Sequence, residues 1–234
     1  INNMTHIEKD LMRLALSLNQ NNFPHILDGE LYVHGEDFQT NMEYIKKYRK
    51  GKTERIQFHI YDKINPEDFK NRIGSLSFIE GLSRGLNLNS LAFIHSHQIT
   101  SESMLKTAHK AYLKCGYEGT MIRRGNSIYK VNGRSSGLLK YKDFQDIALV
   151  IKDIVPCKVE TEWGEPIFEW KGATSHRLGK DILGAGTKMS HDQRKDLLIN
   201  KHKYIGKTAE LRFFEYSNKG VPRFPIMHGI RLDK

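Results

Sequence analysis

Cysteine and long apolar runs are scarce in this sequence of 234 residues, and each shortage excludes a class of protein. Its two cysteines, Cys115 and Cys157, belong to no C-x-x-C pair or Cys/His cluster, so we expect neither a disulfide framework nor a zinc site. No apolar run approaches the roughly 18 residues of a membrane-spanning helix. With 38% hydrophobic and 10% aromatic residues, the composition predicts a soluble globular protein rather than a disordered one.

Acidic residues are outnumbered by basic ones. The sequence has 37 lysines and arginines against 27 aspartates and glutamates, which gives a net charge of +10. This excess favours a polyanionic partner, most often nucleic acid, because fixed cations displace the counterions condensed on phosphates. The first residues carry no signal peptide. The two isolated cysteines fit a reducing cytoplasm. Its length suffices for one large or two small domains.

Two segments alternate apolar and polar residues with period two, which is typical of strands with one buried face. In residues 26–33 the polar face carries Asp28 and Glu30, and in residues 55–62 it carries Tyr61. Each polar face is therefore a candidate for a site.

Apolar residues at helical spacing predict helices at residues 5–18, 66–79 and 100–115. A further strand is expected at residues 91–96. The mixture of helices and strands predicts an α+β fold for this part of the chain.

Beyond Gly119 the sequence favours strands, which we expect at residues 120–123, 127–131, 138–142, 147–155, 166–170 and 208–216. A Gly-rich stretch at residues 172–188 and a short helix capped by Ser190 interrupt them as an insertion. Several short strands over about 90 residues are typical of a small β-barrel, of which the OB-fold commonly handles nucleic acid. We therefore predict a first domain at residues 1–143 and a second at residues 144–234.

Five side chains could carry phosphate chemistry. Lys140 and Lys142 lie two apart on a strand, so both ammonium groups would face one anion such as phosphate; an exposed strand edge is the simpler explanation. Glu118 precedes an apolar strand and could hold Mg²⁺, or it could pair with a lysine. Glu30 could accept a hydrogen bond from a ribose or help place metal, or form a salt bridge. Tyr61 could stack on a base, or be an ordinary strand tyrosine.

Read in order, five short segments resemble motifs III, IIIa, IV, V and VI of the ATP-dependent DNA ligases, within the covalent nucleotidyltransferases. They are residues 27–31 (LDGEL), 58–62 (FHIYD), 118–123 (EGTMIR), 138–144 (LLKYKDF) and 231–234 (RLDK). The resemblance implies an adenylation domain of antiparallel sheets and helices, followed by an OB-fold β-barrel. The small basic form of the chain is similar to phage and bacterial enzymes, so the cytoplasm would be that of a bacterium or a phage-infected host.

The same resemblance implies a function and a set of roles. The enzyme would be a monomer that uses ATP and Mg²⁺ to seal nicks in double-stranded DNA, during replication, repair or recombination, through enzyme–AMP and DNA–adenylate intermediates. For the nucleotide, the resemblance implies that Glu30 contacts the sugar or metal, Tyr61 stacks on adenine, Glu118 binds metal, and Lys140 and Lys142 hold the α-phosphate. From the second domain, Arg231, Asp233 and Lys234 would orient pyrophosphate. The implied DNA-backbone contacts are Lys171, Arg177, Lys180 and Lys188.

One ligase motif is missing. No K-x-D-G, which carries the nucleophilic lysine of the family, occurs in these residues, and the sequence does not begin with Met. We therefore expect an upstream part to be missing and this chain alone to be inactive in self-adenylation. Three alternatives stay open: an RNA ligase, a capping guanylyltransferase, and a non-catalytic nucleic-acid-binding protein on the same scaffold.

Overall fold

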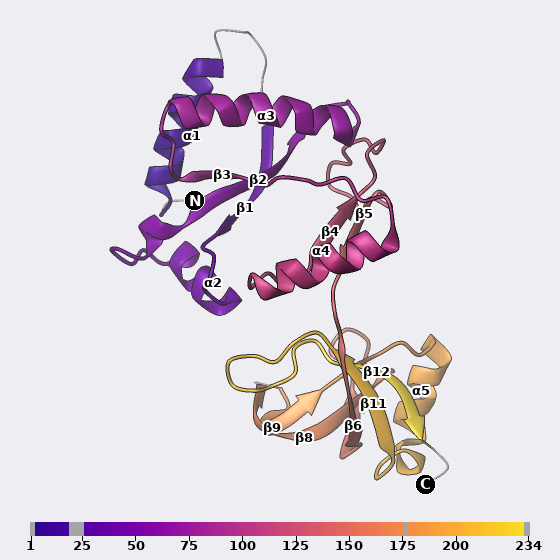
Figure 1. Ribbon diagram of the computed structural model, residues 1–234. Coiled ribbons are helices and arrows are strands. Elements are labelled where there is room, and N and C mark those ends of the chain that lie inside the picture. The colour runs from indigo at the N-terminus through magenta and orange to yellow at the C-terminus, as the bar shows by residue number, and fades with distance from the viewer. Residues whose placement is uncertain (1–2, 19–25, 176, 232–234) are drawn as a thin grey trace. The chain divides into compact units, whose positions relative to one another are not determined.

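The computed structural model describes residues 3–18, 26–175 and 177–231, and it divides the chain into two compact units, Ile1–Tyr141 and Lys142–Lys234 (Figure 1). The domain boundary expected between residues 143 and 144 falls just inside the second of these units. None of the helices in the described residues is both long and apolar enough to cross a membrane.

A three-stranded sheet organises the first unit. Strand β1 (Ile26–Tyr32) pairs antiparallel with β2 (Gln57–Ile64), and β2 pairs parallel with β3 (Leu91–Phe93). Helix α3 (Phe69–Gly85) connects β2 to β3, as a parallel pair requires. The pairing of β1 with β2 is antiparallel, as expected, and the parallel strand β3 makes the sheet mixed.

Helices α1 (Thr5–Leu18) and α3 pack against this sheet and build its core (Figure 1). The buried cluster contains Leu14 of α1, Ile56 just before β2, Ile60 within it, and Leu76 of α3. Because successive strand residues point to opposite faces, Asp28 and Glu30 of β1 and His59 of β2 lie on the face away from this core.

The pairing of β1 with β2 is irregular next to the predicted polar face. Asp28 pairs with Asp62 and Gly29 pairs with Ile60, so Tyr61 is the extra residue of a bulge. A Cβ atom at Gly29 would lie 2.5 Å from the carbonyl oxygen of His59, so glycine is needed for this close approach.

Helix α2 (Phe38–Lys46) and the short helix η2 (Thr53–Arg55) lie between β1 and β2, and the sequence patterns did not predict them. Asp37 caps α2 by accepting a hydrogen bond from the backbone nitrogen of Thr40 at 2.9 Å.

A second, two-stranded sheet joins β4 (Thr120–Arg123) to β5 (Leu138–Tyr141), and helix α4 (Glu102–Lys114) lies against it. His109 of α4 is buried; its Nδ1 lies 2.9 Å from the hydroxyl oxygen of Thr120, and its ring centroid lies 4.7 Å from that of Tyr141. Lys140 alternates with Tyr141 along the strand, so it lies on the face of this sheet away from α4.

The strand expected at residues 127–131 is absent; a single bridge between Asp68 and Ile128 stands in its place. The backbone of this region instead caps the start of α3. The backbone nitrogen of Phe69 donates to the carbonyl oxygen of Ser127, and that of Lys70 donates to the carbonyl oxygen of Gly125, both at 2.9 Å. The open N–H groups at a helix start need such acceptors, and this need explains the loop.

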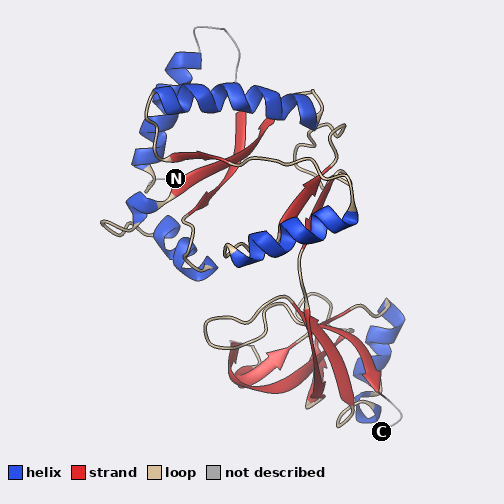
Figure 2. Ribbon diagram, viewed as in Figure 1, coloured by secondary structure: helices blue, strands red, loops and turns tan. Residues whose placement is uncertain are grey.

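The second unit consists mainly of strands (Figure 2). Its elements are β6 (Gln145–Val150), β7 (Asp153–Pro156), β8 (Gly164–Ser175), β9 (Gly179–Gly184), β10 (Gly186–Thr187), α5 (His191–Ile199), η3 (Lys201–Lys203), β11 (Thr208–Phe213) and β12 (Ile226–Arg231). They form one sheet of order β10-β12-β11-β6 and another of order β7-β8-β9. An apolar cluster that includes Phe168, Leu197 and Leu211 fills the interior.

Two expectations for this unit were wrong. Residues 172–188 are not an insertion, because they form the end of β8, β9 and β10. Gly172 lies within β8, where its pairing with β9 is irregular, and Gly179 begins β9; their φ angles of +88° and +96° show that these glycines permit bends in the strands themselves. The strand expected at residues 147–155 is divided into β6 and β7. The cap at Ser190 was correct, and it forms a full capping box with Gln193.

Candidate active site

The polar face of β1 and β2 gathers two tyrosine hydroxyls around one carboxylate. Tyr129 donates a hydrogen bond of 2.7 Å to Oδ2 of Asp28, and Tyr61 is also hydrogen-bonded to Asp28. Burial and then the negative charge of Asp28 raise the pKa of Tyr61 to about 12. Burial and then the hydrogen bond to Asp28 raise the pKa of Tyr129 to about 12. Both hydroxyls therefore stay protonated at neutral pH.

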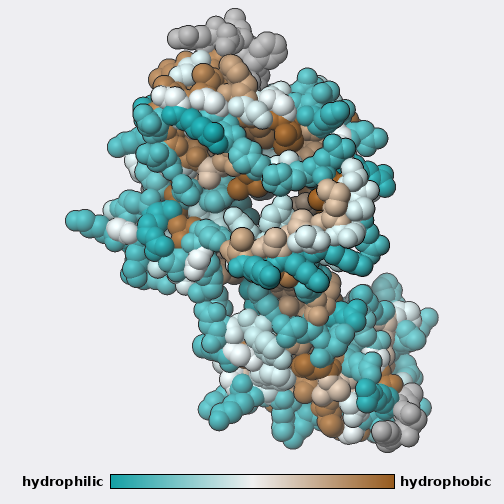
Figure 3. All heavy atoms as spheres, viewed as in Figure 1, coloured by the Kyte–Doolittle hydropathy of each residue, from teal (hydrophilic) through white to brown (hydrophobic). Residues whose placement is uncertain are grey.

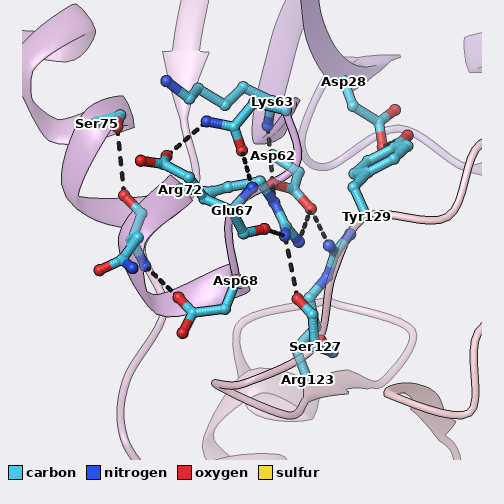
Figure 4. Close-up of polar contacts among 12 residues, drawn as sticks. Asp28, Asp62, Lys63, Glu67, Asp68, Arg72, Ser75, Arg123, Ser127 and Tyr129 are labelled. Atoms are coloured by element: carbon cyan, nitrogen blue, oxygen red, sulfur yellow. Dashed lines mark hydrogen bonds and ion pairs between the residues drawn. The ribbon is translucent and has the colours of Figure 1, made fainter.

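Next to Tyr61, the carboxylate of Asp62 is fully buried and binds two arginines (Figure 4). Arg72 of α3 donates to both of its oxygens, at 2.8 Å and 3.1 Å, and Arg123 of β4 forms a second ion pair with it. Arg72 also donates to the carbonyl oxygens of Glu67 at 2.6 Å and Ser127 at 3.1 Å. These three charged side chains thus join β2, α3, β4 and the loop after β4.

The two arginines also lie near the rings of this region. The guanidinium carbon of Arg123 lies 4.9 Å from the ring centroid of Phe69 and 5.8 Å from that of Tyr61. That of Arg72 lies 5.6 Å from the ring centroid of Tyr129. Cations at such distances are attracted to the faces of aromatic rings, so Arg123 and Arg72 help to fix the two tyrosines that contact Asp28.

Sequence reasoning missed Arg72, Arg123 and Tyr129. A signal for one of these contacts was present in the sequence, because Arg72 stands in the apolar stripe of its helix and Asp62 follows Ile60 at period-two spacing. A buried charge needs a partner of opposite sign, so these two positions indicate a pair. Arg123 ends the motif-like segment at residues 118–123, but that segment does not indicate its contact with Asp62, and no local pattern indicates Tyr129.

Glu30 and Glu118, the two carboxylates predicted to bind metal, both lie close enough to the Tyr32 hydroxyl to affect its pKa. Burial and the neighbouring Tyr117 raise the pKa of Tyr32, and the charges of Glu118 and Glu30 raise it further. Glu118 and Glu30 are both exposed. Within the described residues no group of three or more His, Cys, Asp or Glu side chains could hold a metal. Two carboxylates nevertheless fit Mg²⁺, which usually keeps several waters and binds substrate phosphates.

Two histidines and a second tyrosine lie around Tyr32. The ring centroid of His59 lies 5.2 Å from that of Tyr32, and the two rings are nearly perpendicular at 82°. His34 accepts or donates a hydrogen bond of 3.1 Å with the hydroxyl of Tyr32, and its ring lies 4.7 Å from that of Tyr117. His59 pairs across the sheet with Glu30.

Lys140 and Lys142 lie in different units. Lys140 is exposed, on the same side of the β4–β5 sheet as Arg123, which reaches Tyr61 and Asp62. Strand β5 ends at Tyr141, and Lys142 begins the second unit, where its ammonium lies 3.4 Å from the ring centroid of Phe214. The shared contact of Lys140 and Lys142 with one phosphate therefore stays a prediction.

The residues predicted to contact DNA lie on or beside β8, β9 and β10. Lys171, Lys180 and Lys188 are exposed. Arg177 instead forms an ion pair with Glu165 and donates a hydrogen bond of 2.8 Å to the carbonyl oxygen of Pro156.

The C-terminal residues are described in part. Arg231, predicted to orient pyrophosphate, ends β12 and forms an ion pair of 2.7 Å with Glu210 of β11. The other two predicted residues, Asp233 and Lys234, lie outside the described residues.

Comparison with known proteins identifies the family. The model described as ATP dependent DNA ligase domain matches residues 1–142, and the model described as DNA ligase OB-like domain matches residues 169–231. The chain therefore belongs to the family of ATP-dependent DNA ligases, as the motifs had indicated. The expected α+β unit followed by an OB-fold is also confirmed.

Individual relatives agree with this assignment. A DNA ligase of African swine fever virus is 24% identical over 94% of this chain and 53% of its own length. The DNA ligase of Enterobacteria phage T4 is 27% identical over 57% of this chain and 28% of its own length. A solved structure described as Pmar-Lig_Pre has the same fold, with a TM-score of 0.75 at 20% identity over 98% of this chain and 56% of that one. The chain thus spans about half the length of the African swine fever virus ligase and of the Pmar-Lig_Pre structure.

Proposed function

We propose that this chain supplies the nucleotide site and the OB-like unit of an ATP-dependent DNA ligase that seals nicks in double-stranded DNA. The observation that carries the proposal is the ligase-domain match over residues 1–142, on a unit whose polar face gathers Glu30, Tyr61 and Glu118. The first unit would be the adenylation domain and the second unit the OB-fold domain. The enzyme would act as a monomer in the cytoplasm, in replication, repair or recombination.

The proposed reaction consists of three transfers. A lysine attacks the α-phosphate of ATP and pyrophosphate leaves; the AMP then passes to the 5′-phosphate at the nick; the 3′-hydroxyl finally attacks that phosphate and releases AMP. Negative charge builds on phosphate oxygens in every transfer, so fixed cations lower each barrier. Lys140, on the side of its sheet that Arg123 shares, is the cation of the first unit that we assign to the α-phosphate. Lys142 would join it.

The remaining roles follow the chemistry of each side chain. Tyr61 would stack on adenine, and Asp28 and Arg123 hold its hydroxyl and ring. Glu30 would accept a hydrogen bond from the sugar. Glu118, with Glu30, would hold Mg²⁺, which neutralises charge on the phosphates when bound.

The second unit would bind DNA and assist AMP transfer. Lys171, Lys180 and Lys188 would contact the backbone, while Arg177 would contribute less because Glu165 and Pro156 already engage it. Arg231, Asp233 and Lys234 would orient pyrophosphate. For Arg231, this role requires that it leave Glu210, which is feasible because both side chains are about half exposed, at 49% and 54%.

The test uses the full-length protein with a labelled nicked DNA duplex, ATP and Mg²⁺. We expect a sealed strand that depends on both additions. Sealing of nicked RNA alone would favour an RNA ligase instead, and binding of DNA without any sealing would favour a non-catalytic nucleic-acid-binding protein. A mock reaction with EDTA provides the control.

A further inference from the structure

One ring nitrogen on the polar face of β2 lacks a partner. Nε2 of His59 is buried and forms no hydrogen bond within the described part of the chain. Most buried polar atoms are paired, because losing water without gaining a hydrogen bond costs free energy. Because this nitrogen lies beside the proposed nucleotide site, we expect the bound ligand to supply its missing hydrogen-bond partner.

The surroundings of His59 limit the kind of group. Burial lowers the pKa of His59, and the nearby His34 lowers it further, so the ring is neutral at neutral pH. A neutral imidazole offers one donor and one acceptor and no charge, which suits a hydroxyl better than a phosphate. The nearly perpendicular ring of Tyr32 packs against His59 and limits its rotation.

The position of His59 indicates which part of a nucleotide lies nearest. His59 pairs directly with Glu30 across the sheet, and it lies two residues before Tyr61 on the same face of β2. A ligand whose base stacks on Tyr61 would therefore extend its sugar past His59 and Glu30. Both side chains suit sugar hydroxyls, since a carboxylate accepts hydrogen bonds and a neutral imidazole can donate or accept them.

We propose that His59 is a nucleotide-binding residue whose Nε2 forms a hydrogen bond with a sugar hydroxyl of ATP, next to Glu30. This inference rests on the proposed function and adds a residue to its nucleotide site.

The test compares three variants of the full-length protein by the KM for ATP in AMP transfer to the enzyme. H59F keeps a planar ring without nitrogen, and His59→Gln places an amide near the position of Nε2. H97F is the matched control, because His97 is an exposed histidine in a different segment. We expect H59F to raise the KM for ATP about tenfold, the loss of one neutral hydrogen bond, with kcat nearly unchanged. His59→Gln should recover part of the loss, and H97F should match the wild type.

Two further measurements separate binding from folding. The KM is also measured with 2′-deoxy-ATP and with 3′-deoxy-ATP. For the analogue that lacks the hydroxyl bound by His59, H59F and the wild type should have the same KM. The melting temperature of nucleotide-free H59F should equal or exceed that of the wild type, because the variant removes an unpaired buried nitrogen.

Several results would overturn the inference. They are an unchanged KM in H59F, an equal loss with ATP and with both deoxy analogues, or a lowered melting temperature that accounts for the loss of activity. AMP transfer by the wild type with an unchanged KM in H59F would refute the role of His59 and leave the proposed function standing. A wild type that transfers no AMP would refute both.

Discussion

The two units bury different kinds of side chains. Among the described residues, the buried polar and charged side chains all belong to the first unit: Asn41, Thr53, Asp62, Arg72, Ser83, Ser90 and His109. The buried cluster of the second unit is apolar. Its charged pairs are exposed, as in Arg212 with Asp146, or half-buried, as in Arg223 with Glu215. On the face drawn in Figure 3 hydrophilic side chains dominate the exterior.

This difference indicates where each unit needs fixed geometry. A buried ion pair is weak evidence for added stability, because removing charges from water cancels much of their attraction. The pair of Arg72 with Asp62 does hold several elements at fixed positions around Tyr61. We infer that the first unit uses its polar interior to position a site, whereas the second provides a rigid scaffold with charge on its surface.

The largest effect is expected for Lys140→Ala. Loss of a fixed cation that stabilises developing phosphate charge should reduce nick sealing about a thousandfold in the full-length protein. The fold should persist, because Lys140 is exposed. Lys50→Ala, at another exposed lysine of the first unit, is the control. Sealing by Lys140→Ala at a near-normal rate would remove Lys140 from the site.

Arg72→Met should produce the next largest effect, on stability. It leaves Asp62 buried with reduced compensation, which should cost about 3–5 kcal/mol of unfolding free energy. Unfolding of the second unit can be followed separately by tryptophan fluorescence, because both tryptophans, Trp163 and Trp170, belong to that unit. Urea should unfold the variant earlier by circular dichroism, while the tryptophan fluorescence transition stays in place.

The matched control for this variant is Arg212→Met, which breaks an exposed pair of the second unit. We expect it to leave both unfolding transitions nearly unchanged. Equal shifts of the urea unfolding midpoint in the two arginine variants would contradict the account that the buried pair matters more to its unit than the exposed pair does.

Part of this architecture could be read from the sequence, because its signals are local. Period two in residues 26–33 places Asp28 and Glu30 on one face, and the apolar stripe of residues 66–79 predicts α3. The strand expected at residues 127–131 was wrong, because its backbone groups serve the start of α3. Glycine in residues 172–188 suggested a loop, but Gly172 permits a bend within β8 and Gly179 one at the start of β9.

The site was less accessible to sequence reasoning, because its contacts join distant segments. Arg123 reaches Asp62 from 61 residues away, and Tyr129 reaches Asp28 from 101 residues away. Neither contact produces a periodic signal. The end of β5 at Tyr141, one residue before the second unit begins, could not be foreseen either, because the sequence predicted one strand over residues 138–142.

A smaller effect is expected from the surface charge of the second unit. DNA affinity of the full-length protein should fall steeply as salt rises, as for any interface with many phosphate contacts. Lys180→Ala should weaken binding about equally for all sequences and reduce the salt slope by about 1. Arg177→Ala should change the slope less, because Glu165 already pairs with it. A flat salt dependence in the wild type would refute this role for the second unit.

The smallest effect is expected at alkaline pH. The pKa values of Tyr61 and Tyr129 rise from 10.0 to about 12 in the folded protein. Between pH 10 and 12 the folded state therefore binds more protons than the unfolded state. The stability that these hydroxyls contribute is fully present below pH 10 and declines as the pH rises toward 12. Tyr129→Phe should flatten this decline in circular dichroism. Stability that rises over the same range would contradict the assignment of these hydroxyls to Asp28.

The most direct test of the central claim, that the first unit positions a nucleotide for transfer, is incubation of the full-length protein with ATP labelled at the α-phosphate. The protein should become covalently labelled by ATP and not by labelled GTP, and added nicked duplex should discharge the label as the strand is sealed. Label from GTP alone, or no label at all, would contradict it.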